Sequence, residues 1–138
     1  SVEMLETALD RFARDAAPAT IPVLALRQLG RFFALVPNEQ PAELTALAAR
    51  IVEEFETFRA PLSEAEVAKR NPETLPQAER DNLLRWGYPY VMDEFRFHMT
   101  LTDKTAPQDS DAVRAAPERE FATVIRKPLA ADQLALFV

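Results

Sequence analysis

The sequence predicts an α+β fold in which helices cover one face of an antiparallel β-sheet. Apolar residues recur at helical spacing in residues 2–16 and 40–58, whereas strand composition or period-two alternation marks 21–37, 91–102 and 133–138. The three strand segments can join one sheet, and the helices then bury its apolar face. A chain of 138 residues has the size of a single domain, so we predict one domain over residues 1–138.

The first half of the chain contains two amphipathic helices and a hairpin. Residues 2–16 place apolar side chains three or four positions apart, which predicts a helix. Residues 21–37 predict a hairpin in which Gly30 supplies the turn conformation. Pro41 lies in the first turn of the helix over 40–58, whose apolar face predicts a role in the core. These elements supply most of the expected core.

Two capping boxes predict two further helices in the middle of the chain. In a capping box, two side chains satisfy each other's exposed backbone amides at the start of a helix. Ser63 and Glu66 fit the first box, and Thr74 and Gln77 fit the second. Gly87 is a natural C-terminal residue for the second helix.

The C-terminal third predicts a loop, a helix and a final strand. Residues 103–110 are polar, which is typical of a mobile loop. The apolar residues Val113 and Phe121 mark a helix that Pro117 can interrupt. The apolar run at 133–138 predicts the last strand.

The segment 91–102 carries the polar residues of greatest interest. Its apolar and polar residues alternate, so one face of the predicted strand belongs to the core and the other is polar. Side chains two positions apart on a strand lie about 7 Å from each other. His98 and Thr100 can therefore both contact one phosphate-sized anion. The alternative is a solvated strand face without a ligand. The polar face consists of Glu94, Arg96, His98, Thr100 and Thr102.

Composition limits the possible partners. The formal charge of −6 and the pI near 4.9 argue against binding of long nucleic acid, which requires many phosphate contacts from basic residues. A small phosphorylated ligand needs only a local cluster of donors. The absence of cysteine fits a cytoplasmic location, and no apolar run is long enough to span a membrane. No spacing typical of metal ligands is present.

The block Arg85–Thr102, with its H-x-T element at His98–Thr100, resembles the DUF1045 branch of the 2H phosphoesterase superfamily. This branch is associated with phosphonate-utilisation genes. Phe58–Ser63 and Leu134–Val138 are also similar to that family. The resemblance implies one lobe of a bilobal fold and a hydrolase that needs neither metal nor cofactor. It also implies a small phosphodiester as substrate, for example a cyclic phosphate on ribose.

The resemblance also implies roles for individual residues. His98 would be the general acid or base and Thr100 the phosphate ligand. Arg96 would contact the anion, although a salt bridge to an acidic neighbour is an alternative. The aromatic residues themselves, apart from the resemblance, suggest that Tyr88 or Tyr90 stacks on a base or binds a phosphate; alternatively, these rings and Trp86 form a hydrophobic corner that fixes the strand.

One departure from the family pattern affects the expected activity. Members of the superfamily are similar in carrying two H-x-T or H-x-S elements, whereas this chain has one histidine. We therefore expect the chain to be an incomplete portion of a longer protein whose first element lies upstream of residue 1. A homodimer that brings two copies of His98 together would also supply the second imidazole. The competing functions are a non-catalytic module that binds a ligand or a protein, and a scaffold without a site.

Overall fold

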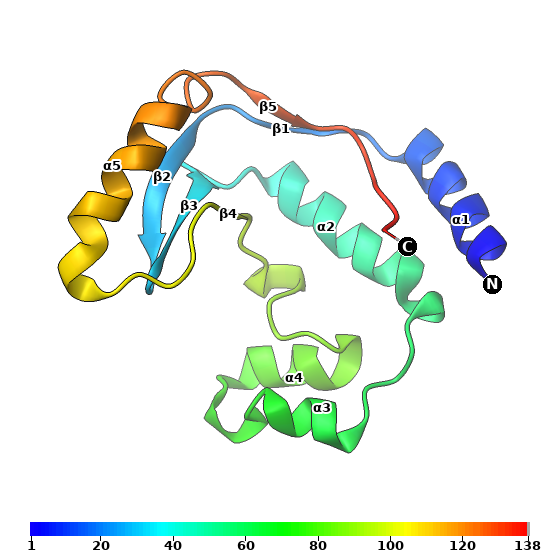
Figure 1. The fold of residues 1–138 in the computed structure, drawn as a ribbon. Helices are drawn as coiled ribbons and strands as arrows, with labels where there is room; N and C mark the ends of the chain where they lie inside the picture. Colours follow the sequence, from blue (N-terminus) through cyan, green and yellow to red (C-terminus); the bar gives the residue numbers. More distant parts are fainter. Residues whose placement is uncertain (138) are drawn as a thin grey trace. The chain divides into compact units, whose positions relative to one another are not determined.

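The computed structural model describes residues 1–137 and confirms the predicted α+β class (Figure 1). All strand pairs in the described residues are antiparallel, but they form two sheets where the sequence predicts one. The chain divides into two compact units, and each combines segments that are distant in sequence. The first contains Ser1–Pro18, Ala42–Arg96 and the residues from Asp132 onward, and the second contains Ala19–Pro41 and Phe97–Ala131.

The first unit is helical. The rings of Phe12 and Phe55 lie 5.6 Å apart between centroids, and Phe12 is buried, so the first two helices meet through apolar side chains. An ion pair between Arg11 and Glu54 joins the same two helices. The predicted helices over 2–16 and 40–58 are thus confirmed, the second with a final 3₁₀ turn. The helices are α1 (Val2–Asp15), α2 (Ala42–Phe55), α3 (Glu64–Lys69) and α4 (Gln77–Trp86), with 3₁₀ turns at Glu56–Phe58, Pro72–Thr74 and Met92–Glu94.

The first capping box is confirmed. The Ser63 hydroxyl accepts a hydrogen bond from the backbone N–H of Glu66, at 3.3 Å. The Glu66 carboxylate accepts from the Ser63 N–H at 2.8 Å and from its hydroxyl at 2.7 Å. These hydrogen bonds favour the ionised form and hold the pKa of the Glu66 carboxyl below its ordinary value. The box therefore opens α3 as the sequence predicts.

The prediction of a second capping box is wrong. Thr74 belongs to a 3₁₀ turn, where its hydroxyl donates to the Asn71 carbonyl at 2.8 Å. This hydroxyl closes the preceding turn and does not cap a helix. The residue before α4 is Pro76, which makes no side-chain capping bond. Gly87 does end α4 as predicted, in a left-handed conformation with φ of 78°.

Arg59 lies against Gly87. Its guanidinium donates to the Glu56 carboxylate at 2.5 and 2.9 Å, to the Ala60 carbonyl at 3.2 Å and to the Arg85 carbonyl at 3.3 Å. The bond to Arg59 lowers the pKa of Glu56. A Cβ atom at Gly87 would lie 2.8 Å from Arg59 Nη1. Because four hydrogen bonds hold the guanidinium, it cannot move aside without loss.

Alanine at position 87 is expected to destabilise the protein more than alanine at position 30. Both glycines have positive φ, 78° and 59°, so each substitution incurs about 1–2 kcal/mol of backbone strain. Nothing lies within 4 Å of a Cβ at Gly30, whereas a Cβ at Gly87 displaces Arg59. Urea unfolding should therefore show an additional loss of about 1 kcal/mol for G87A. Equal losses would mean that Arg59 rearranges without cost.

The second unit contains both sheets. The strands β2 (Leu24–Leu29), β3 (Phe32–Pro37) and β4 (Met99–Thr100) form one sheet in that order. Gly30 and Arg31 turn the chain between β2 and β3, which confirms the predicted hairpin. The strands β1 (Ala19–Ile21) and β5 (Leu129–Ala131) form the other sheet.

The helix α5 (Ser110–Phe121) lies along one face of the three-stranded sheet (Figure 1). The Ser110 hydroxyl donates to the Gln28 side chain at 3.0 Å, and the Leu24 N–H donates to the Ile125 carbonyl at 3.3 Å. Both ends of the helical segment are thus fixed to β2. Leu24, Phe33 and Leu35 are buried on this face. The helix continues through Pro117, so the predicted interruption is wrong.

The predicted strand over 91–102 is largely wrong. Met92, with φ of 53°, begins a 3₁₀ turn, and only Met99 and Thr100 form β4. β3 extends to Pro37, but the residues before Met99 do not pair with it. The Phe97 N–H donates to the Gln40 side chain at 2.8 Å. Beyond β4, the Leu101 N–H and the Thr102 hydroxyl each form a hydrogen bond with the Phe33 backbone. Exposure nevertheless alternates from Arg96 to Leu101, as in an extended chain.

The predicted strand over 133–138 is also wrong for the described residues. Its place is taken by β5, which pairs Leu129 with Ile21 and Ala131 with Ala19. Because β1 has three residues, it offers no pairing positions beyond Ala131. Residues 132–137 have no strand structure, and Val138 lies outside the described residues.

The polar segment 103–110 is anchored at its centre. Thr105 is 8% exposed, and its N–H donates to the Arg31 carbonyl at 2.5 Å. The Arg31 Nε in turn donates to the Thr105 carbonyl at 3.4 Å. Pro107–Asp109 then forms a 3₁₀ turn that leads into α5. The segment predicted as a mobile loop is therefore fastened to the hairpin turn.

Candidate functional site

His98 and Thr100 lie on the face of the three-stranded sheet opposite to α5. Both side chains are exposed, whereas Met99 between them is half-buried. Thr100 pairs with Ala34 of β3, and the His98 ring lies 6.2 Å from the Phe32 ring between centroids. Phe32 and Ala34 are two residues apart on one strand, so they share a face. The structure thus brings His98 and Thr100 to the same face, as predicted.

The two threonines after His98 differ in their availability. The Thr102 hydroxyl accepts from the Phe33 N–H at 3.0 Å and donates to the Asp103 carbonyl at 3.0 Å. Thr102 therefore extends the contact with β3 beyond the end of β4. Within residues 1–137, the Thr100 hydroxyl makes no hydrogen bond. Of the two hydroxyls, that of Thr100 is the one free to bind a ligand.

Arg96 does not belong to this face of the sheet. It is the last residue of its segment in the first unit, whereas His98 and Thr100 belong to the second. Its guanidinium donates to the Asp93 carbonyl at 2.6 Å and to the Phe95 carbonyl at 2.8 Å. These bonds stabilise the turn that precedes the extended segment.

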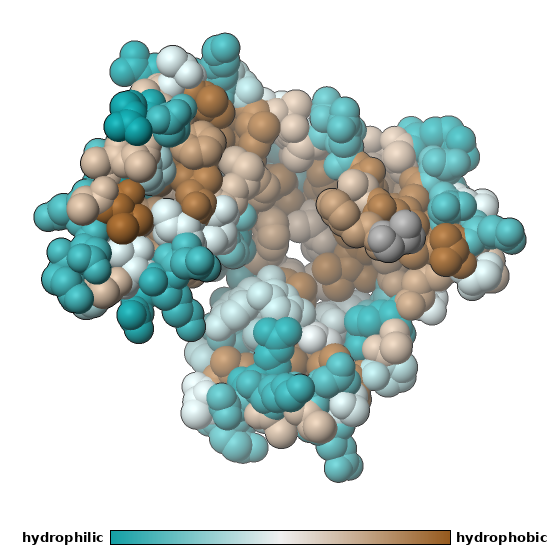
Figure 2. All heavy atoms as spheres, viewed as in Figure 1, coloured by the Kyte–Doolittle hydropathy of each residue, from teal (hydrophilic) through white to brown (hydrophobic). Residues whose placement is uncertain are grey.

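Tyr88 and Tyr90 form an exposed aromatic pair in the first unit. Their exposed fractions are 42% and 47%, and their rings meet edge to face at 5.7 Å. The guanidinium of Arg70 lies 5.0 Å from the centre of the Tyr88 ring. Figure 2 shows that hydrophilic side chains dominate the visible surface of α3 and α4, at the bottom of the view. The rings are therefore a partly solvated cluster and not a buried corner.

Asn82 fixes the segment that carries these tyrosines. Its side-chain amide donates to the Pro89 carbonyl at 3.2 Å and to the Val91 carbonyl at 3.0 Å. Pro89 is buried between the two exposed rings. No sequence motif identifies Asn82, because its partners lie seven and nine residues away in an irregular segment.

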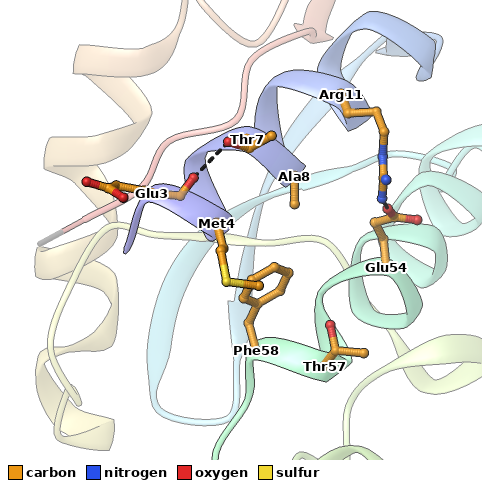
Figure 3. Close-up of a pocket in the computed structure, with 8 residues that line it drawn as sticks. All are labelled: Glu3, Met4, Thr7, Ala8, Arg11, Glu54, Thr57 and Phe58. Atoms are coloured by element: carbon orange, nitrogen blue, oxygen red, sulfur yellow. Dashed lines mark hydrogen bonds and ion pairs between the residues drawn. The ribbon is translucent and has the colours of Figure 1, made fainter. Parts of the chain in front are cut away.

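The first unit also contains an open cavity of about 540 Å³ between α1 and the end of α2 (Figure 3). Met4 and Phe58 contribute apolar surface, and the charge of Arg11 is neutralised by Glu54. An anion in this cavity would find no free cation among the lining residues, because the one basic residue, Arg11, is paired with Glu54. The cavity therefore does not suit a phosphate group. Its lining consists of Glu3, Met4, Thr7, Ala8, Arg11, Glu54, Thr57 and Phe58.

Two kinds of feature are absent from residues 1–137. This part of the chain brings together no group of three or more histidine, cysteine, aspartate or glutamate side chains suited to a metal ion. None of its helices has the length and apolar character needed to cross a membrane.

The DUF1045 family, described as a protein family of unknown function, matches residues 1–138. The chain belongs to the DUF1045 family. This DUF1045 chain is also similar to the ribose 1,5-bisphosphate phosphokinase PhnN of Janthinobacterium sp. (strain Marseille), with 43% identity over 115 residues. The alignment covers 80% of the DUF1045 chain but only 25% of the relative. No solved structure matches the chain.

Proposed function

We propose that this chain is the His98-bearing lobe of a metal-independent phosphoesterase that acts on a small phosphodiester. One observation supports this most directly. His98 and Thr100 are both exposed on one sheet face, and the Thr100 hydroxyl has no hydrogen-bond partner within residues 1–137. Their spacing suits one phosphoryl group that contacts both side chains. Membership in the 2H superfamily, which the H-x-T element suggests, belongs to the same proposal.

The chemistry is a hydrolysis. Water attacks phosphorus, one P–O bond forms, and the P–O bond to the leaving oxygen breaks. Imidazole groups exchange protons near neutral pH, so His98 would take the proton of the attacking water or give one to the leaving oxygen. The Thr100 hydroxyl would donate a hydrogen bond to a phosphoryl oxygen as negative charge develops there.

A second proton-transfer group is needed for full activity. The chain has one histidine, and a missing general acid or base costs about 10²–10⁴-fold in rate. Within the proposal, the second group comes from a longer natural polypeptide or from His98 of another copy of the chain. A homodimer would make the activity per chain rise with protein concentration.

The substrate class is proposed from the comparisons. The DUF1045 resemblance links the chain to phosphonate metabolism, and the name of the 43% identical relative refers to a ribose bisphosphate. Both support a small phosphorylated sugar, such as a cyclic phosphate on ribose. The phosphokinase reaction in that name is not part of the proposal. Gly30 and Gly87 are the only glycines, so the chain has no glycine-rich phosphate loop.

The single histidine also favours a second candidate function. A non-catalytic module that binds a phosphorylated ligand needs a cluster of donors but no pair of proton-transfer groups. Such a module would use the same sheet face with His98 and Thr100. The two candidates differ in turnover, because a module binds the phosphodiester and leaves it intact.

The protein is expected to open a cyclic ribose phosphodiester to a monoester, and T100V is expected to slow this reaction by about 10- to 100-fold. The estimate corresponds to loss of one hydrogen bond to a charged group. Hydrolysis can be followed by ³¹P NMR, for this chain and for the natural polypeptide that contains it. Thr20 is an exposed strand residue of the other sheet, so T20V is the matched control.

Each outcome of this experiment distinguishes the candidates. Turnover that T100V slows and T20V leaves unchanged supports the phosphoesterase. Saturable binding without turnover, in the chain and in the longer polypeptide, supports the binding module. Turnover that is equal in T100V and T20V would place the reaction elsewhere in the protein.

A further inference from the structure

A third polar side chain shares the sheet face of His98 and Thr100. Arg27 on β2 pairs directly with Ala34 on β3, and Ala34 pairs directly with Thr100 on β4. Directly paired residues of antiparallel strands carry their side chains on the same face. Arg27, Ala34 and Thr100 therefore form one row across the sheet. With about 4.8 Å between neighbouring strands, the outer two Cα atoms lie about 10 Å apart.

Both ends of the row are open to solvent. Arg27 and Thr100 are both exposed, whereas Ala34 between them is fully buried. A ligand can therefore contact the two ends of the row but not Ala34. An extended arginine side chain reaches about 6–7 Å from its Cα atom, which is most of the distance across the row. Within the described chain, the Arg27 guanidinium has no ion pair or hydrogen bond that would compete with an anion.

Other arginines of the same unit are less suited to this role. Arg31 donates to the Thr105 carbonyl in the hairpin turn. Arg114 and Arg119 on α5 form ion pairs with Glu118 and Glu120. Arg126 lies in the turn after α5, the helix that covers the opposite face of the sheet. Arg27 is the arginine that is in register with Thr100.

The proposed reaction needs a fixed positive charge at this position. A phosphodiester is an anion, and more charge develops on its oxygens during hydrolysis. A threonine hydroxyl is neutral, and an imidazole alternates between charge states as it transfers a proton. A guanidinium stays charged and can bind two phosphoryl oxygens at once. Arg96, expected from the sequence to contact the anion, is bonded to carbonyls of its own turn.

We infer that Arg27 is a binding residue of this face, and that its guanidinium holds the non-bridging oxygens of the phosphoryl group that Thr100 contacts. The inference rests on the proposed function and adds the cation that the H-x-T element lacks. It assigns the site to the two outer strands of the three-stranded sheet, β2 and β4, on either side of the buried Ala34 of β3.

The test uses the only histidine as a reporter. Inorganic phosphate is added to the full chain, and the His98 imidazole signal is followed by NMR in the wild type, R27Q, R126Q and T100V. The wild type is expected to show a saturable shift. R27Q is expected to raise the dissociation constant of phosphate by about tenfold or more, since it removes a charged hydrogen-bond donor. R126Q makes the same charge change away from the row and should stay within about twofold.

The outcomes separate this inference from the proposed function. A large loss in R27Q with little change in R126Q supports the inference. Equal affinities of R27Q and the wild type, with a loss in T100V, would overturn the role of Arg27 and leave the phosphate site of His98 and Thr100 standing. Equal losses in R27Q and R126Q would also overturn it, because the effect would then be one of net charge. A wild-type signal that does not saturate would overturn both.

Discussion

Alanine at position 98 is expected to lower kcat/KM for a cyclic phosphodiester by about 10²–10⁴-fold. This is the usual loss when a general acid or base is removed. His98 is exposed, so the unfolding free energy should change by no more than about 1 kcal/mol. Steady-state hydrolysis and urea unfolding of the same sample measure the two effects. A large loss of activity with little loss of stability would identify a chemical role.

A second variant at this position separates binding from proton transfer. Asparagine keeps a polar group of similar reach but cannot exchange a proton near neutral pH. H98N should therefore bind inorganic phosphate within a few-fold of the wild type and still lose hydrolysis. Hydrolysis that survives in both H98A and H98N would contradict a catalytic role for His98. Loss of phosphate binding in H98N, with no change in stability, would instead indicate a mainly binding role.

Alanine at position 33 is expected to destabilise the protein by about 3–5 kcal/mol, the range for a fully buried phenylalanine. Phe33 is 1% exposed and lies on the central strand of the three-stranded sheet. Its backbone also connects to the site. The Phe33 N–H donates to the Thr102 hydroxyl at 3.0 Å, and its carbonyl accepts from the Leu101 N–H at 2.9 Å. The cavity left by F33A should therefore loosen the strand of Thr100 as well.

The control for F33A is a truncation of an exposed apolar side chain. Leu84 is 64% exposed on α4, so L84A should change the unfolding free energy by about 0.5 kcal/mol or less. Both variants can be compared by their urea midpoints. A loss below about 1 kcal/mol in F33A would mean that the sheet repacks around the missing ring, and that the buried face contributes less to stability than its exposure indicates.

Local signals predicted the elements that depend on neighbours in sequence. The Ser63–Glu66 box, the Gly30 turn and the helical spacing of residues 2–16 each act within a few residues, and the structure confirms all three. Thr74 fits the same capping pattern, but its hydroxyl bonds to Asn71 behind it. A side chain with two possible local partners cannot be assigned from spacing alone.

Pairing between distant segments was the main feature that could not be predicted from the sequence. Residues 96–101 alternate in exposure as predicted, yet only Met99 and Thr100 form a ladder with β3. Alternating exposure indicates an extended chain, whereas the length of a strand depends on how many of its residues pair with a neighbouring strand. The pairing of Ala19–Ile21 with Leu129–Ala131 joins segments that lie over a hundred residues apart, and its alanines carry little strand propensity.

The candidate site could be predicted only in part, because it too depends on pairing between distant segments. His98 and Thr100 are two residues apart, so their shared face follows from the geometry of any extended segment. Arg27 lies on the same sheet face as these residues because of the register between β2 and β3 and the register between β3 and β4. Arg96 was misplaced because the predicted strand was too long, and the chain turns before it reaches the sheet.

The bond between Gln40 and Phe97 gives the chain the topology of an insertion. Gln40 Oε1 accepts a hydrogen bond from the Phe97 N–H at 2.8 Å. The chain therefore leaves the second unit after residue 41 and returns to it at residue 97, at nearly the same point. The 55 residues of Ala42–Arg96 therefore form an insertion whose two ends lie close together. The entropy cost of closing such an insertion depends only weakly on its length. Evolution could therefore lengthen, shorten or exchange this helical segment while the pairing of Thr100 with Ala34 stays fixed.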